Sequence, residues 1–207
     1  IVIVKLYAKF AFRIKKGILM KMNKIGLLLL LILSCHAIYS QEKINQVDNK
    51  GKKEGVWKGI FEDSKRPRYE GTFKNGVEVG TFKYFDDTKA QTVIATRTFS
   101  DDGKVAQTTF FDQKNNKVSE GKTVNRLNDG VWNYYHKVSK QLMTVENYKN
   151  GKLEGSRIVY FPSGAIAEES TYKNGQREGL YKVYLENGVV AEESHFVKNQ
   201  YEGEAIF

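Results

Sequence analysis

A Gly-x-x-x-Gly pair recurs along most of the chain, and its period constrains the fold more than any other feature. The second glycine of the pair stands at positions 55, 80, 130, 155, 179 and 203, so the steps are 25, 50, 25, 24 and 24 residues. The double step contains a degenerate copy around residues 100–125. Two copies have lost the first glycine, which is replaced by Arg126 and Asn199. A period of this length indicates supersecondary units that stack on one another.

Each unit contains two short runs rich in Val, Ile, Thr, Tyr, Phe and Trp, separated by turn residues. Asn-Gly dipeptides at 75–76, 150–151, 174–175 and 187–188 favour type I′ turns, since both residues tolerate a positive φ. Pro162-Ser163-Gly164 marks another turn. Beyond residue 45 no stretch has a sustained 3.6-residue apolar period. The sequence therefore predicts an all-β fold of tandem β-hairpin repeats of 24–25 residues, forming an elongated, twisted antiparallel meander sheet.

Glycines and aromatic residues occupy fixed positions in the unit. A glycine at a strand entrance commonly permits the close approach of a neighbouring group. We therefore expect an aromatic ring of a neighbouring strand to lie over each second glycine, and large rings to cover much of the inner face of the sheet. The structural glycines are Gly51, Gly55, Gly76, Gly80, Gly130, Gly151, Gly155, Gly164, Gly175, Gly179, Gly188 and Gly203. The repeat aromatics are Trp57, Phe82, Phe85, Trp132, Tyr135, Tyr148, Tyr160, Tyr172, Tyr181, Tyr184 and Phe196.

The unit Y-x-N-G-x-x-x-G-x-x-x-x-Y-x-x-x-G resembles the bacterial variant of the MORN repeat (membrane occupation and recognition nexus) over residues 51–207. The resemblance implies an elongated antiparallel sheet that acts as a scaffold. Some bacterial members of the variant family are catalogued as antitoxins, which implies neutralisation of a partner toxin as an alternative role. The departures at Arg126, at Asn199 and through residues 100–125 argue against a uniform ligand groove.

The positive charge of the chain is concentrated in its first 40 residues, which hold seven basic residues and no acidic one. Removing those seven from 33 leaves 26 basic against 24 acidic residues, or +2 for residues 41–207. A nearly neutral body does not build the basic stripe that phosphate binding requires, so we expect no nucleic-acid partner. The only cysteine is Cys35, and His136 and His195 fall at different positions of their units. We therefore expect no metal site and no cofactor.

The candidates for catalysis are glutamates at equivalent positions of the repeat. Adjacent glutamates on a strand point to opposite faces, and equivalent ones lie roughly 10 Å apart, two strands away, in near-identical environments. Acid–base catalysis needs two carboxyls whose environments push their pKa values apart. We therefore expect a solvated strand face and no enzyme. The glutamates are Glu168-Glu169 and Glu192-Glu193, with Glu70 and Glu120 in the register of Glu169 and Glu193.

Residues 20–40 have the order of a secretory signal peptide. Lys21 and Lys24 supply the positive start, Ile25–Leu33 an apolar centre of nine residues, and Ser34–Ser40 the exit. The apolar centre is far shorter than the ~20 residues that span a bilayer as a helix. Residues 1–19 precede the first methionine and are interpreted as upstream sequence, with a long genuine leader as the alternative. Residues 41–50 form a linker to an array of about six and a half units over 51–207, the last of which is expected to be truncated.

Two processing sites remain open. Cleavage before Gln41 has Ser40 at −1 but a bulky Ile38 at −3. The segment Ile32-Leu33-Ser34-Cys35 resembles a lipobox in which Leu33 is a poor fit at −2. We favour soluble export to the periplasm or cell surface, and an outer-membrane lipoprotein anchored through Cys35 is the alternative.

These features predict a non-enzymatic exported repeat scaffold that binds a protein or a component of the cell envelope. An antitoxin-like protein that neutralises a partner toxin is the second hypothesis. A lipoprotein scaffold associated peripherally with membrane lipid is the third.

Overall fold

The computed structural model describes residues 43–203. The predicted signal peptide, Cys35, residues 1–19 and the end of the last unit lie outside the described residues. No helix between residues 43 and 203 is long and apolar enough to cross a membrane. The strands are β1 (Gln46–Val47), β2 (Lys53–Ile60), β3 (Pro67–Lys74), β4 (Val77–Phe85), β5 (Val93–Phe99), β6 (Val105–Phe111), β7 (Lys117–Val124), β8 (Leu127–Tyr135), β9 (Leu142–Lys149), β10 (Lys152–Tyr160), β11 (Ile166–Lys173), β12 (Gln176–Tyr184), β13 (Val190–Val197) and β14 (Gln200–Tyr201).

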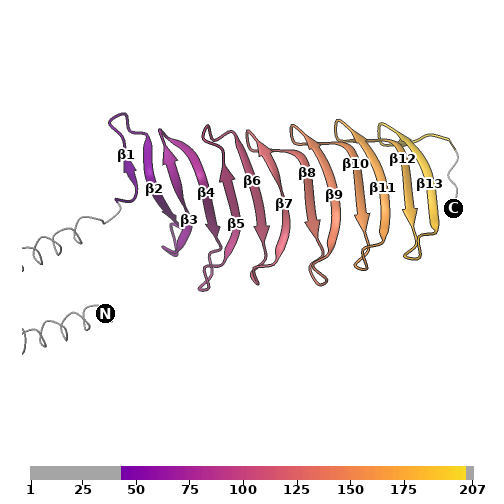
Figure 1. Cartoon of the computed structure of the whole chain (residues 1–207), viewed down its shortest axis with the longest axis horizontal. Coiled ribbons are helices and arrows are strands. Elements are labelled where there is room, and N and C mark those ends of the chain that lie inside the picture. The colour runs from indigo at the N-terminus through magenta and orange to yellow at the C-terminus, as the bar shows by residue number, and fades with distance from the viewer. Residues whose placement is uncertain (1–42, 204–207) are drawn as a thin grey trace, which may run out of the picture. The chain divides into compact units, whose positions relative to one another are not determined.

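All of these strands form one 14-stranded sheet in which the spatial order equals the chain order (Figure 1). Each strand pairs antiparallel with the next, as short hairpin connections require. The predicted all-β meander of hairpin repeats is therefore confirmed. The segment 41–50, predicted as a linker, contributes β1, whose Gln46 and Val47 pair with Glu54 and Lys53.

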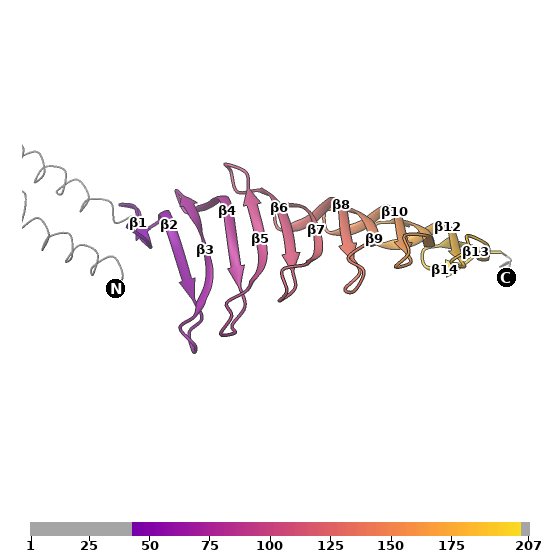
Figure 2. The ribbon, with the colours of Figure 1, turned by 60° about the horizontal axis from the view of Figure 1, so that its bottom comes forward.

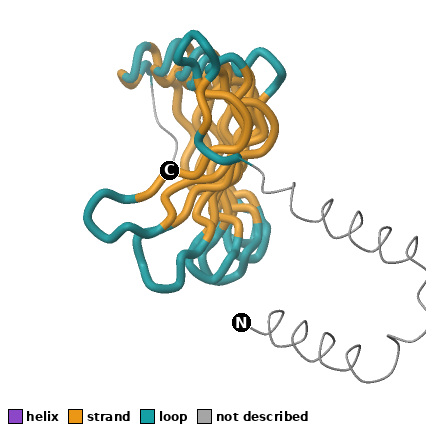
Figure 3. Tube along the Cα trace, turned by 90° about the vertical axis from the view of Figure 1, so that its left-hand side faces the viewer, coloured by secondary structure: helices purple, strands orange, loops and turns teal. Residues whose placement is uncertain are grey.

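The sheet is twisted, as strand chirality dictates. In Figure 2 the strands β2–β5 are seen along their length, whereas β10–β13 are seen nearly end-on. Figure 3 shows the strands curving between two rows of loops. We call the side that carries Phe82, Arg97 and Trp132 the inner face, and the side that carries Lys83 and Glu169 the outer face.

The predicted type I′ turns are present where the first glycine of the pair follows an asparagine. Both residues have positive φ at Asn75-Gly76 (53° and 82°), and the same holds at 150–151 and 174–175. The copies without this glycine keep the conformation, since Arg126 and Asn199 each have a φ of 69°. The prediction was wrong for residues 187–188, because Gly188 alone has positive φ. It closes a three-residue loop, in which Leu185 and Val189 are hydrogen-bonded.

The expectation that rings cover the second glycines was wrong. Gly155 has a φ of +89° at a shift of register between β9 and β10, and a Cβ added to it would find only Asn147 Cβ, at 3.9 Å. Gly80 has a φ of +65° and open space around it. In this left-handed conformation a side chain would project toward the outer face, away from the rings. These residues are glycine because a β-bulge requires their backbone conformation.

Rings instead cover a different set of glycines, which sequence reasoning did not single out. A Cβ on Gly71 would lie less than 3.0 Å from the Phe82 ring, and one on Gly121 equally close to the Trp132 ring. Gly59 has the same relation to Tyr69. The close approach of ring and backbone that we expected therefore exists, but it occurs on the inner face, at the centres of β3 and β7 and near the end of β2.

The hydrophobic core lies on the inner face and is built from single rings of successive strands. Phe82 is 1% exposed and makes edge contacts with Phe73 and Phe99, at centroid distances of 5.2 and 5.4 Å. Ala106 completes the buried cluster, and Trp57 packs against it. Because a single sheet has no opposing layer, the rings of adjacent strands exclude water for one another.

Candidate binding groove

A central row of side chains crosses the inner face, each opposite the next in the strand register. Large rings alternate with glycine or serine along most of this row. The alternation is interrupted twice, at Arg97-Thr108 and at Glu146-Arg157. The row is Trp57, Gly71, Phe82, Arg97, Thr108, Gly121, Trp132, Glu146, Arg157, Ser170, Tyr181 and Ser194.

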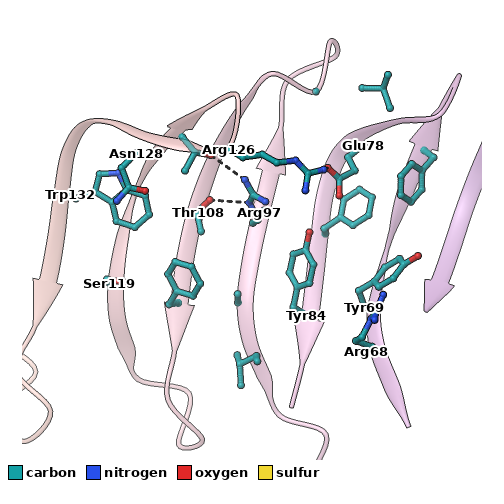
Figure 4. Close-up of a pocket in the computed structure, with 18 of the residues that line it drawn as sticks. Arg68, Tyr69, Glu78, Tyr84, Arg97, Thr108, Ser119, Arg126, Asn128 and Trp132 are labelled. Atoms are coloured by element: carbon teal, nitrogen blue, oxygen red, sulfur yellow. Dashed lines mark hydrogen bonds and ion pairs between the residues drawn. The ribbon is translucent and has the colours of Figure 1, made fainter. Parts of the chain in front are cut away.

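A groove of about 1200 Å³ lies on the inner face over β2–β8, around the first interruption (Figure 4). Trp132 at its floor is 3% exposed, because it covers Gly121 and packs against its neighbours. Phe110 is 42% exposed and is the most accessible ring in the groove. The neighbouring strands carry the small residues Ala95 and Ser119 opposite Phe110, and the Trp132 ring lies 6.4 Å from the Phe110 ring between centroids.

Arg97 occupies the centre of the groove, between Thr108 on β6 and Tyr84 on β4 (Figure 4). Its Nε donates to Thr108 Oγ1 at 3.3 Å, its Nη2 donates to Thr123 Oγ1 at 3.2 Å, and the guanidinium stacks over Phe99 at 4.9 Å. Among residues 43–203, no carboxylate lies within 4.0 Å of this guanidinium. Arg97 is therefore a half-buried cation whose internal hydrogen-bond partners are neutral.

A salt bridge crosses the edge of the groove above Arg97. Arg126 occupies the left-handed turn position of a lost repeat glycine, and its Nη2 lies 2.9 Å from Glu78 Oε2 on β4. With Glu78 engaged in this way, the groove holds four basic side chains and one acidic one, a net charge of +3. The basic residues are Lys53, Arg68, Arg97 and Arg126. Burial raises the pKa of the Tyr84 hydroxyl above its ordinary value, and Glu78 raises it further. The electrostatics of the groove favour an anionic ligand.

The second interruption of the central row is an internally satisfied ion cluster. Arg157 on β10 lies 3.1 Å from Glu146 of β9 and 2.6 Å from Glu168 of β11. Glu146 also accepts a hydrogen bond from Tyr148. The pKa of the Tyr148 hydroxyl is raised, first by burial and then by this bond to a carboxylate.

The glutamates considered for catalysis divide between the two faces, as predicted for neighbours on a strand. Glu168 and Glu192 lie on the inner face, where each contacts a serine, and Glu192 also accepts from Tyr201. The outer-face members do not share one environment, which corrects that expectation. Glu70 pairs with Lys83 and Glu193 with Lys182, whereas Glu120 and Glu169 accept from tyrosine hydroxyls.

Two of the repeat aromatics, Tyr135 and Tyr184, bind these outer-face glutamates. The Tyr135 hydroxyl donates to Glu120 at 2.5 Å, and the Tyr184 hydroxyl donates to Glu169 at 2.5 Å. Burial and the bond to Glu120 raise the pKa of Tyr135 to about 12. The same bond, with Lys117, lowers the pKa of Glu120. These rings lie on the outer face, away from the groove.

The structure keeps the histidines apart. His136 Nε2 donates to the carbonyl oxygen of Tyr160 at 2.9 Å, and His195 lies 3.5 Å from Glu202. Within the described part of the chain, no group of three or more His, Cys, Asp or Glu residues is arranged to hold a metal ion.

The sequence did not predict this groove, which lies where the repeat is irregular. Arg126 and residues 100–125 depart from the repeat pattern and argue against a groove along the whole array. Arg126 and several residues of that segment line the groove, which is therefore confined to this part of the sheet. Arg97 was missed. The available signal was the degenerate copy, in which Thr108 stands where other copies place a ring.

Comparison with known proteins identifies the repeat. Residues 153–174 and 177–198 match the MORN repeat variant family. No curated protein matches the chain. Among solved structures, the crystal structure of the GtfA/B complex is 17% identical, with a TM-score of 0.30, over 44% of this chain and 18% of that chain. A mutant of S. aureus TarM in complex with Fondaparinux, alpha-GlcNAc-glycerol and UDP is 16% identical, with a TM-score of 0.23, over 90% of this chain and 27% of that chain.

The chain thus spans 18% and 27% of the length of these two structures, and TM-scores this low carry no functional argument. The family match falls on the hairpins β10–β11 and β12–β13, whose two sequences nearly coincide. The strand pattern of these hairpins continues back to β2. Residues 153–198 therefore carry two repeats of the MORN variant type, and the hairpins before them have the same strand pattern.

Proposed function

We propose that this chain is an exported, non-enzymatic scaffold whose inner-face groove binds a partner protein or another anionic component of the cell envelope. The observation that carries the proposal is the half-buried Arg97, which has only neutral hydrogen-bond partners in a groove of net charge +3. A half-buried charge is costly unless it is paired, so a site of this kind favours an external anion.

The arrangement of the carboxylates supports binding over catalysis. Glu146 and Glu168 share one arginine, and Glu70 and Glu193 each pair with a lysine. A general acid and a general base need separate environments that face a common substrate. These glutamates instead form ion pairs of the kind that stabilise a sheet.

The direct test of the proposed function is site-specific crosslinking in cells. Phe110 and Thr109 are adjacent on β6 and point to opposite faces. A photoreactive phenylalanine analogue at position 110 should give a discrete adduct, and the same analogue at position 109 should give none. Equal adducts from both positions, or none from position 110, would contradict the proposal.

The export part of the proposal rests on the signal-like order of residues 20–40. Cell fractionation with N-terminal sequencing should recover a chain that begins near Gln41 outside the cytoplasm. A diacylglycerol group on Cys35 would assign the lipoprotein alternative. The antitoxin alternative predicts two observations together. The chain would be found in the cytosol with residues 20–40 intact, and the analogue at position 110 would form its adduct there with one small protein.

A further inference from the structure

The inner face holds two arginines in its central row, and their surroundings differ in one decisive respect. Arg157 has Glu146 opposite it on one side and Ser170 on the other, with Glu168 two residues from Ser170. Both carboxylates bind its guanidinium, at 3.1 and 2.6 Å. This site shows that the sheet satisfies an inner-face arginine with carboxylates from both flanking strands.

Arg97 has the same kind of position without the carboxylates. Phe82 stands opposite it on β4, Thr108 stands opposite it on β6, and Phe110 stands two residues from Thr108. An arginine has five N–H donors, and Thr108 and Thr123 engage two of them. The guanidinium also interacts with the Tyr84 hydroxyl on β4, a neutral partner, and its other donors face the groove. Its ring neighbours Phe99 and Phe110 lower the local polarity, which strengthens any ion pair formed there.

We propose that Arg97 is the anchor of a carboxylate-binding site, and that its occupant is an extended acidic segment of a partner protein. This inference rests on the proposed binding function and names its ligand. A carboxylate takes the place at Arg97 that Glu146 and Glu168 take at Arg157, and it forms the bidentate pair that a guanidinium favours. Arg126 and Arg68 supply further positive charge along the groove.

The shape of the groove favours a peptide over a sugar chain or a membrane. Phe82 and Trp132 are buried at 1% and 3% exposure, so Phe110 is left as a single exposed ring and the groove lacks a row of open rings on which successive sugars could stack. The site is a hollow, whereas a bilayer surface needs a protruding basic and apolar face. From β2 to β8 the groove spans roughly 29 Å by the interstrand spacing, which is the length of about nine residues of extended chain. Phe110 offers an apolar side chain of such a segment a contact next to Arg97.

The test is fluorescence anisotropy with the exported chain and a labelled, end-blocked peptide that spans the groove and alternates glutamate with phenylalanine. The peptide should bind, and its counterpart with glutamine for glutamate should bind at least tenfold more weakly. Arg97→Gln should weaken binding of the glutamate peptide about tenfold, which corresponds to about 1.4 kcal/mol. Arg97→Lys should cost less, because lysine keeps the charge without the planar fork. Lys83→Gln, on the outer face of the adjacent strand β4, is the matched control and should change nothing.

Equal affinity for the two peptides, or full affinity in Arg97→Gln, would overturn the carboxylate site. Binding of a sulfated oligosaccharide or of phosphatidylglycerol vesicles in place of the peptide, lost in Arg97→Gln, would overturn the ligand class. Thermal melting of each variant verifies that it is folded, and Arg97→Lys provides a second variant that retains the cation. If the position 110 adduct forms while the peptide test fails, the groove binds a partner of other chemistry and the proposed function stands. If neither the adduct nor peptide binding is observed, the proposed function and the carboxylate site are both wrong.

Discussion

Alanine and asparagine should destabilise the array in opposite order at two of its glycines, Gly121 and Gly155. Gly121 lies under the Trp132 ring, and a Cβ there would approach the ring to less than 3.0 Å. Gly155 has open space, with its nearest contact at 3.9 Å, but a φ of +89°. The first glycine is therefore required by packing and the second by backbone conformation, although both stand in the same sheet.

The magnitudes follow from these two causes. Gly121→Ala should cost about 1–3 kcal/mol, the usual penalty of overpacking, because Trp132 is 3% exposed and has little room to move. Gly155→Ala should cost about 1–2 kcal/mol, the strain of placing a Cβ in the left-handed region. Asparagine separates the causes. It tolerates positive φ and should be better than alanine at 155, whereas its larger side chain should be worse than alanine at 121.

The assay is urea unfolding with hydrogen exchange, in a Trp57→Phe background so that fluorescence reports Trp132 alone. Gly121→Ala should shift the Trp132 emission and loosen β7–β8, while β11–β13 stay protected, because each repeat contacts only its neighbours. Gly155→Ala should leave the Trp132 emission unchanged. If alanine and asparagine rank in the same order at both positions, the distinction between packing and backbone is refuted.

Two further predictions concern polar contacts. The pKa of Tyr135 is raised to about 12 from 10.0, so its contribution to stability is fully present below pH 10 and is lost between pH 10 and 12. Thermal melting of Tyr135→Phe should therefore show a shallower loss over that range, and an unchanged slope would argue against the bond to Glu120. Arg157→Met leaves Glu146 and Glu168 without their cation and should destabilise by about 1–3 kcal/mol, less than a fully buried pair because all three groups keep some solvent contact. A change within about 0.5 kcal/mol in urea would show that water replaces the arginine at no cost.

The sequence determined the fold because the information needed for it is local and repeated. Alternating strand-forming runs and Asn-Gly turns specify a hairpin, and a period of 24–25 residues stacks hairpins in chain order. Adjacent glutamates such as Glu168 and Glu169 were placed on opposite faces for the same reason, since side-chain alternation is a property of any strand. The positive φ of Asn75 and Gly76 follows from the turn chemistry of two residues.

The candidate site was decided only by tertiary structure, because it depends on what lies across the strands. The role of Gly155 could not be separated from that of Gly121 in the sequence, since one depends on a bulge and the other on a ring of the next strand. In the sequence, Arg97 cannot be distinguished from any other arginine of a strand. Only the strand register shows that Thr108 lies opposite it, where other copies have a ring and where a carboxylate could have paired with it. The pairing of Arg126 with Glu78 joins residues 48 positions apart. Because the repeat is local, the sequence predicts the architecture. The role of the residues that depart from the repeat depends on contacts between strands, which only the tertiary structure defines.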